Sequence, residues 1–224
     1  MAVTWNVSGS PQYVSGGPAS FTVPITTYNI GDQIILVGGA VGNGGSVYAG
    51  QIDSMDSPAV SGGITADVTN GLDNFSGIWR GIVTAVGTYN LNVYVSSTNS
   101  GAYAALVVQS FTVAGTMGVE SSADLSSGGS SGSGSFPSLS PVAGNELYVT
   151  GGQIPSTPFT TTTSGFTLLP YAASGLNVGM GYILNATTPN TYSPNWSAPN
   201  YGAYNLLAEL LTTRVTGNPI VMLL

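Results

Sequence analysis

Residues 88–95 read Thr-Tyr-Asn-Leu-Asn-Val-Tyr-Val, and their side chains alternate strictly in kind. In an extended chain one face would carry Tyr89, Leu91, Val93 and Val95. The opposite face would carry Asn90, Asn92 and Tyr94. A period of two is that of a β-strand that packs one face on a core and turns the other towards solvent. The stretch therefore predicts an antiparallel sheet with one covered face.

Further strand signals lie on both sides of this stretch. Residues 33–37 (Gln-Ile-Ile-Leu-Val) form a short apolar run that ends at two glycines, which indicates a strand buried on both faces. Residues 21–25 alternate around a proline, which favours a sheet edge or the start of a strand. Residues 105–113 read as another strand. Because Gly and Pro recur at the short intervals typical of sandwiches, the predicted fold class is all-β.

The chain carries a weak internal repeat. Residues 31–41 align with residues 144–154 through three matching glycines, and residues 101–106 align with residues 202–207 in the same order. Residues 204–211 (Tyr-Asn-Leu-Leu-Ala-Glu-Leu-Leu) have a composition that suits a helix. Their counterpart in the first half is rich in Val and Thr, so we predict a strand there as well.

The repeat predicts one antiparallel β-sandwich with two pseudo-repeated halves, and the resemblance given below implies that it is jelly-roll-like. Residues 1–18 are predicted as an N-terminal arm and residues 19–224 as a single sandwich. Its halves span residues 19–114 and 137–215, joined by a Ser/Gly-rich crossover at residues 115–136. The pattern also fits two tandem small sandwiches of roughly 100 residues each, and both organisations stay open.

Charged residues are scarce in this chain of 224 residues. There is no Cys and no His, the only basic residues are Arg80 and Arg214, and nine acidic residues bring the net charge to -7. Charged residues make up 5% of the chain, against about 25% in an ordinary domain. A hydrophobic content of 42% argues against disorder. The surface must then consist mainly of hydroxyl and amide groups, which pack against neighbouring subunits without the cost of burying charge.

No targeting segment is evident. The N-terminus has neither a charged region nor an apolar core, so we expect no secretory signal. No apolar run approaches the roughly 20 residues of a transmembrane helix, and the apolar residues 220–224 are far too few. Release by cell lysis, as part of a phage particle, would reconcile a surface-like composition with the lack of an export signal, so the expected location is the exposed surface of a virion.

An ordered series of motifs runs along most of the chain. A Gly-Asp strand at residues 31–37 is followed by an Ile-Asp-Ser turn at residues 52–54, the strand at residues 87–93 and a Gly-Asn-Glu-Leu strand from Gly144. The series resembles jelly-roll-type β-sandwich proteins of tailed-bacteriophage virions, which also occur among bacterial surface proteins. Such proteins typically carry an aromatic residue and Asn or Thr after the turn. This chain has Met-Asp-Ser-Pro at residues 55–58 instead, and this difference argues against a shared ligand site.

The missing residue types exclude many kinds of chemistry. Without His or Cys there is no Ser-His-Asp triad and no Cys-His pair, and zinc lacks its usual ligands. Two arginines cannot form the cationic surface of a nucleic-acid-binding protein. Two of the nine carboxylates could still hydrolyse a glycosidic bond, which keeps a glycosidase as the least favoured alternative. We predict no enzyme activity and no cofactor.

Two weak ligand sites are candidates. Asp53 and Asp56, with Asp67 or Asp73, could supply oxygen ligands to calcium. The alternative is that Asp53 and Asp56 form side-chain turns before Pro58, and no known calcium-loop motif is present.

The second candidate is a carbohydrate platform. Tyr192, Trp196 and Tyr201 lie in the most loop-like aromatic segment, at residues 192–201, and could stack on a sugar. The alternative is that these aromatic residues pack in the core, as they more often do in β-proteins.

The leading hypothesis is a non-enzymatic virion structural protein, namely a capsid decoration, head-fibre or tail-associated subunit. It would act by self-association, with a trimer as a candidate assembly, and by docking on a major capsid or tail protein through strand edges, the N-terminal arm or the apolar C-terminus. The alternative is a carbohydrate- or receptor-binding module on a phage tail or cell surface, whose partner would be a surface glycan. Neither nucleic acid nor a membrane is an expected partner.

Overall fold

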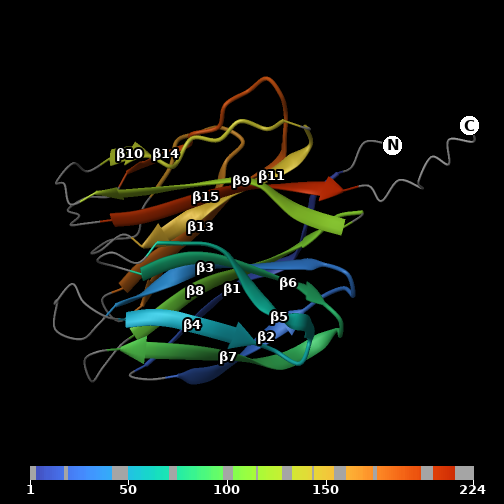
Figure 1. Ribbon diagram of the computed structural model, residues 1–224, viewed down its shortest axis with the longest axis vertical. Helices are drawn as coiled ribbons and strands as arrows, with labels where there is room; N and C mark the ends of the chain where they lie inside the picture. The colour runs from blue at the N-terminus through green and yellow to red at the C-terminus, as the bar shows by residue number, and fades with distance from the viewer. Residues whose placement is uncertain are drawn as a thin grey trace, which may run out of the picture.

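The computed structural model shows a protein built of β-strands (Figure 1). It describes residues 4–17, 20–41, 50–70, 75–97, 103–114, 116–127, 133–142, 144–153, 160–173, 176–197 and 204–214. Over these residues every strand pairing is antiparallel. The predicted all-β antiparallel class is therefore confirmed. The same residues contain no helix of the length and apolarity needed to cross a membrane.

The strands form three sheets. The largest has, in spatial order, β1 (Asn6–Gly16), β8 (Tyr103–Thr112), β3 (Gln33–Val41), β6 (Phe75–Val83), β5 (Val60–Asn70), β4 (Gly50–Asp56), β7 (Gly87–Ser97) and β2 (Phe21–Thr27). The second has β12 (Thr167–Ala173), β13 (Leu176–Ala186), β11 (Glu146–Gln153), β15 (Tyr204–Arg214) and β9 (Thr116–Ser127). The smallest pairs β10 (Ser133–Ser135) with β14 (Asn195–Ser197).

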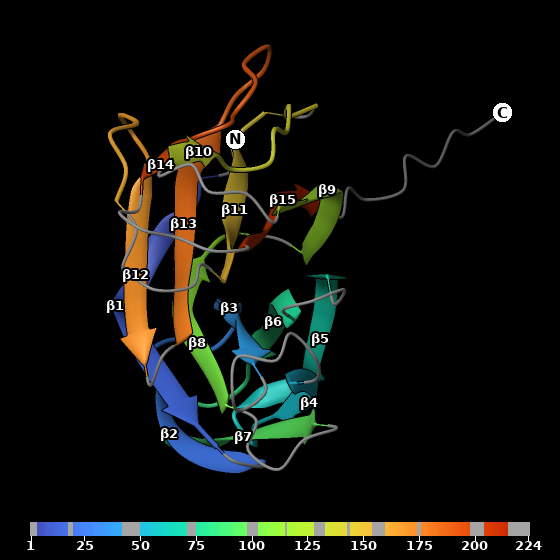
Figure 2. The ribbon, with the colours of Figure 1, turned by 90° about the vertical axis from the view of Figure 1, so that its left-hand side faces the viewer.

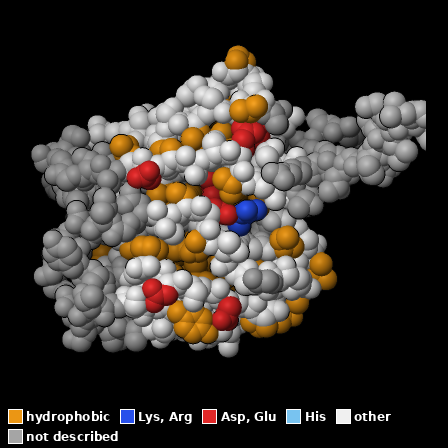
Figure 3. All heavy atoms as spheres, viewed as in Figure 1, with side chains coloured by type: hydrophobic (Ala, Val, Ile, Leu, Met, Phe, Trp, Pro, Cys, Tyr) orange, Lys and Arg blue, Asp and Glu red, His pale blue; other side chains and the backbone are white. Residues whose placement is uncertain are grey.

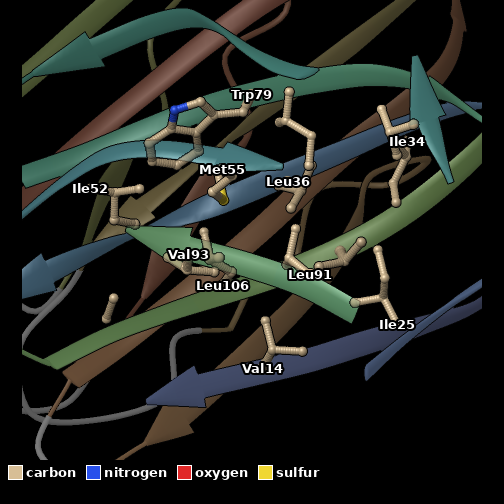
Figure 4. Packing of buried hydrophobic residues seen from close by; sticks show 14 of the residues in the cluster. Val14, Ile25, Ile34, Leu36, Ile52, Met55, Trp79, Leu91, Val93 and Leu106 are labelled. Carbon is tan, nitrogen blue, oxygen red and sulfur yellow. The ribbon is translucent and has the colours of Figure 1, made fainter. Parts of the chain in front are cut away.

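The eight-stranded sheet curls until its two ends almost meet. Apolar side chains from all eight strands fill its interior, among them Ile25, Leu36, Trp79 and Leu91 (Figure 4). Gln12 of β1 bridges the remaining gap to β2, because its side-chain amide donates to the Thr26 carbonyl oxygen at 2.7 Å and accepts from the Thr26 amide at 2.6 Å. At this one position the side-chain amide takes the place of a backbone peptide between the two end strands.

The five-stranded sheet packs against the outside of the first (Figure 2). β12 lies against β1 and β8 at one seam, and β9 lies against β5 at the other. A second apolar cluster, the inter-sheet core, fills the space between the sheets and includes Ile35, Ile78, Val107 and Val149. A third cluster, containing Tyr148 and Trp196, lies between the five-stranded sheet and the β10–β14 pair.

The predicted strands are present where the sequence placed them. Residues 33–37 begin β3, whose first eight residues are all buried, as a strand covered on both faces must be. Residues 88–95 lie in β7, with Leu91 and Val93 buried and Tyr94 exposed. Residues 204–211 belong to β15, so the strand prediction is confirmed against the helix-like composition. Tertiary packing overrides weak helix propensity here.

Two segments differ from the predicted organisation. Residues 6–16 of the predicted arm form β1, which pairs with β8, and Trp5 before it is fully buried with its indole N–H donating to the Asn145 carbonyl at 3.1 Å. The predicted crossover at residues 115–136 contains β9 and β10. Its Ser/Gly-rich composition hid the apolar alternation of β9, whose backbone is paired with β15. Residues 220–224, the other segment expected to reach a partner, lie outside the described residues.

Five neighbouring strands of the largest sheet have the same connectivity as the five strands of the second sheet. In each set the first, fifth, second, fourth and third strand in chain order lie side by side: β1-β8-β3-β6-β5 in the largest sheet and β9-β15-β11-β13-β12 in the second. The strand pairing agrees with the sequence alignment of the halves: Gly38 lies opposite Leu106, and the aligned Gly151 lies opposite the aligned Leu207. The aligned side chains enter different clusters, because Ile34 points into the curled sheet and Leu147 into the inter-sheet core. The jelly-roll and repeat assignments stay predictions.

Candidate functional site

A charged cluster lies between the two large sheets. Arg80 of β6 directs its Nε to both carboxylate oxygens of Asp67 at 2.6 and 2.7 Å, and its Nη1 donates to the Met117 carbonyl of β9 at 3.5 Å. Asp67 is the extra residue of a β-bulge in β5, which aims its carboxylate at Arg80. The Asp67 side chain is 4% exposed and that of Arg80 24% exposed. Figure 3 shows the basic group beside acidic atoms at the boundary between the sheets.

Glu209 of β15 enters the same cluster from the opposite sheet. Its side chain is fully buried, and neither carboxylate oxygen has a hydrogen-bond partner among the described residues. Burial raises the pKa of Glu209 well above its usual 4.5; the charge of Asp67 adds to this rise, and that of Arg80 opposes it. Burial also raises the pKa of Asp67, although Arg80 favours its ionised form. Burial therefore favours the protonated form of Glu209.

This cluster bears on the glycosidase alternative. Asp67 and Glu209 approach from opposite sheets, which is the facing arrangement of carboxylates that glycoside hydrolysis needs. Hydrolysis also needs a substrate between the carboxylates, and Glu209 has no exposed surface that a sugar could contact. The cluster instead ties β5 and β6 to β9 and β15.

The predicted calcium ligands Asp53 and Asp56 lie on β4, and each accepts a hydrogen bond from a side chain of β7. Ser96 donates to the Asp53 carboxylate at 2.8 Å, and Asn92 donates to the Asp56 carboxylate at 2.6 Å. A hydrogen bond to Asp56 raises the pKa of Tyr94. Within the described ranges no three His, Cys, Asp or Glu residues are grouped to hold a metal ion, and Asp73 lies outside those ranges.

The predicted carbohydrate residues do not form an exposed platform. Trp196 lies on β14, is 1% exposed and packs its ring directly over Gly134. Tyr192 is half-buried, and its hydroxyl accepts a hydrogen bond from the Thr187 amide at 2.9 Å. Tyr201 lies outside the described residues. The local reason is that a bulky indole between two sheets stabilises the fold more when buried than when exposed.

A hollow of about 430 Å³ lies beside β10 and β14. Its walls carry hydroxyl and amide groups, including those of Ser135, Thr161 and Asn195. The Asn195 side chain accepts from the Thr161 hydroxyl at 3.0 Å and donates to the Thr162 hydroxyl at 2.9 Å. These groups already satisfy one another, and Trp196 is too buried to present a ring face.

The five-stranded sheet ends in two strands that pair on one side only over the described residues. β12 pairs only with β13, and its centre holds Pro170, which lacks an N–H group. β9 is the longer edge strand, contains no proline and pairs only with β15. The exposed residues along its outer half include Ser122, Asp124 and Leu125.

Sequence reasoning missed both the charged cluster and this edge. A lone Glu209 within an apolar strand was a signal of burial, but no local pattern connects it to Asp67 or Arg80. The β9 edge had a fainter signal, because Met117, Val119, Ala123 and Leu125 occupy alternate positions. Comparison with protein-family models, curated proteins and solved structures finds no match for this chain.

Proposed function

We propose that this protein is a non-enzymatic structural subunit of a virion, which acts by self-association and by docking on a protein shell. The observation that carries the proposal is the open edge of β9. An edge strand presents unpaired N–H and C=O groups that can pair with a strand of a neighbouring subunit. Its partner by this proposal is a second copy of the chain or a strand of the shell protein.

β9 has few of the sequence features that usually prevent strand addition. Natural edge strands are commonly protected by proline, lysine, an inward charge or a β-bulge. β9 has neither proline nor lysine, and its bulge is at Glu120, whose side chain accepts the Val142 amide at 2.8 Å. A bulge at Glu120 shifts the register, which leaves residues 121–127 as one continuous stretch paired with β15.

The surface supports the same function. Figure 3 shows a surface that is mostly uncharged, with separate small acidic and hydrophobic areas. Hydroxyl and amide groups can be buried at a subunit interface once they are hydrogen-bonded, whereas buried charges need a partner. A chain with 5% charged residues is suited to close contact with neighbours.

Light scattering on the purified full chain tests this proposal. We expect a trimer or larger assembly for the parent protein. Leu125→Lys and Ser122→Lys place a lysine on exposed positions of β9, and each should shift the mass towards the monomer because a charged edge resists strand addition. Tyr94→Lys, at a 42% exposed position on β7, is the matched control and should leave the mass unchanged. A monomeric parent protein at all concentrations would contradict self-association, and equal masses for parent and β9 variants would exclude this edge.

A further inference from the structure

Two tyrosines form a surface pair where β1 lies against β12. Tyr13 of β1 is 43% exposed, and Tyr171 of β12 is half-buried. Their ring centroids are 5.4 Å apart, with an angle of 40° between the ring planes. The Tyr171 hydroxyl is 2.9 Å from the Ser15 hydroxyl of β1, which holds the second ring in place beside the first.

A hollow of about 220 Å³ lies next to this pair. Ser15 and Gly17 line it from the β1 side, Tyr103 from the start of β8, and Leu176 from the start of β13. No charged side chain is among its lining residues. Ser15 thus belongs both to the hollow and to the tyrosine pair.

The geometry of β1 places an aromatic face beside the hollow. Tyr13 and Ser15 are two residues apart on one strand, so their side chains point to the same face, about 7 Å apart along the chain. This separation is comparable to the width of a sugar ring. An aromatic face, a hydroxyl group and an uncharged hollow are therefore aligned on one short surface.

Tyr13 remains 43% exposed although its ring packs beside that of Tyr171, so part of its surface is open to a ligand. Binding sites typically combine apolar and aromatic walls with a few placed polar groups, as this seam does.

We propose that the tyrosine seam, defined by Tyr13, Ser15, Tyr103 and Tyr171, binds a neutral saccharide. The C–H face of a sugar ring would stack on Tyr13. Its hydroxyl groups would bond to the Tyr13 and Tyr103 hydroxyls and to the donor and acceptor positions that the Ser15–Tyr171 hydrogen bond leaves free. The absence of charge among the lining residues disfavours phosphate, sialic acid and uronic acid, whose charges would be left unpaired. This site is separate from the hydroxyl-lined hollow beside Trp196, and it does not depend on the β9 edge.

Saturation-transfer NMR on the full chain tests the proposal. The probes are glucose, galactose, mannose, N-acetylglucosamine and their disaccharides at millimolar concentration, with sialyllactose as the charged comparison. We expect transfer to at least one neutral sugar and less to sialyllactose. Titration of the best probe should then show that Tyr13→Ala weakens binding about tenfold or more. Tyr13→Phe, which keeps the ring, should retain most of the affinity.

Matched variants separate binding from folding. Tyr94→Ala removes an equally exposed tyrosine from β7 and should leave the affinity unchanged. Ser15→Ala is a smaller change that should weaken binding without altering the melting temperature. The proposal is overturned if no neutral sugar shows transfer, if sialyllactose binds best, or if Tyr13→Ala and Ser15→Ala both bind as the parent does.

Discussion

At the scale of single residues, Glu209 is the least expected feature of the molecule. A carboxyl group without hydrogen-bond partners in an apolar environment costs free energy, and the cost is greater when the group is ionised. The fold therefore favours the protonated form of Glu209, whose pKa is raised by burial and by the charge of Asp67. Among the described side chains, the positive charge of Arg80 opposes this rise.

We predict that Glu209 makes the protein less stable as pH rises. Its folded pKa lies above the value of 4.5 in the unfolded chain, so its contribution is full below pH 4.5 and is lost as pH rises through the folded pKa. The free energy of unfolding should fall by at most about 1.4 kcal/mol per pH unit in that window. Glu209→Gln cannot ionise and should remove the part of this slope due to Glu209, while Asp67, whose pKa is also raised, keeps its own part. Urea unfolding between pH 4 and pH 8 measures the difference.

Asp124→Asn is the control for this experiment. Asp124 is an exposed carboxylate on the neighbouring strand β9, and its replacement changes the net charge by the same amount. We expect its unfolding free energy to follow the parent curve. Parallel curves for Glu209→Gln and the parent protein would show that Glu209 does not titrate in this window.

At the scale of the strands, glycines set how closely β3 approaches its neighbours. A Cβ on Gly38 would lie 2.0 Å from the carbonyl oxygen of Ala105 and 2.8 Å from the Cα of Leu106, both backbone atoms of β8. β3 and β8 cannot move apart without opening the two cores that lie on their faces. The pair of glycines that ended the predicted strand is thus a packing requirement and lies within β3.

We predict that Gly38→Ala lowers the free energy of unfolding by about 3 kcal/mol, because its methyl group collides with fixed backbone. Gly165→Ala is the matched comparison. Gly165 has a φ of 75° and no atom within 4 Å of an added Cβ. Its replacement should cost only the backbone strain of about 1 kcal/mol. Chemical denaturation of both variants measures their free energies of unfolding. Equal losses of free energy in the two variants would argue against the close approach of β3 and β8.

At the scale of the whole molecule, three apolar clusters share strands. β3 and β8 contribute to the first cluster on one face and to the inter-sheet core on the other, and β11 and β15 likewise join the inter-sheet core to the third cluster. A strand cannot lose its packing on one face without weakening the other. The sheets should therefore unfold together.

We predict a single calorimetric transition whose van't Hoff and calorimetric enthalpies agree. Leu91→Ala removes packing in the first cluster, and Leu210→Ala removes packing in the third. Each should cost about 2 to 5 kcal/mol and shift the one transition downwards. Two transitions, with each variant shifting a different one, would show that the sheets unfold independently.

Local sequence patterns were sufficient to predict several strands of this protein. Alternation at residues 88–95 and the apolar run at residues 33–37 depend only on neighbouring residues, because the period of a strand is a local property. The scarcity of charge was likewise evident from composition alone. The strand at residues 204–211 followed from the internal alignment, and its pairing with β11 has the same register as the pairing of β8 with β3.

The amino-acid sequence by itself determined the all-β class, the antiparallel strands and an uncharged surface, because these follow from period and composition. Tertiary structure alone decided that residues 6–16 join a sheet, that Trp196 is buried, and that β9 is an open edge. It also brought Asp67 to Arg80 and Tyr13 to Tyr171, pairs that are 13 and 158 residues apart in the chain. Burial, sheet edges and clusters depend on which strands become neighbours in space, and side-chain period does not encode that choice.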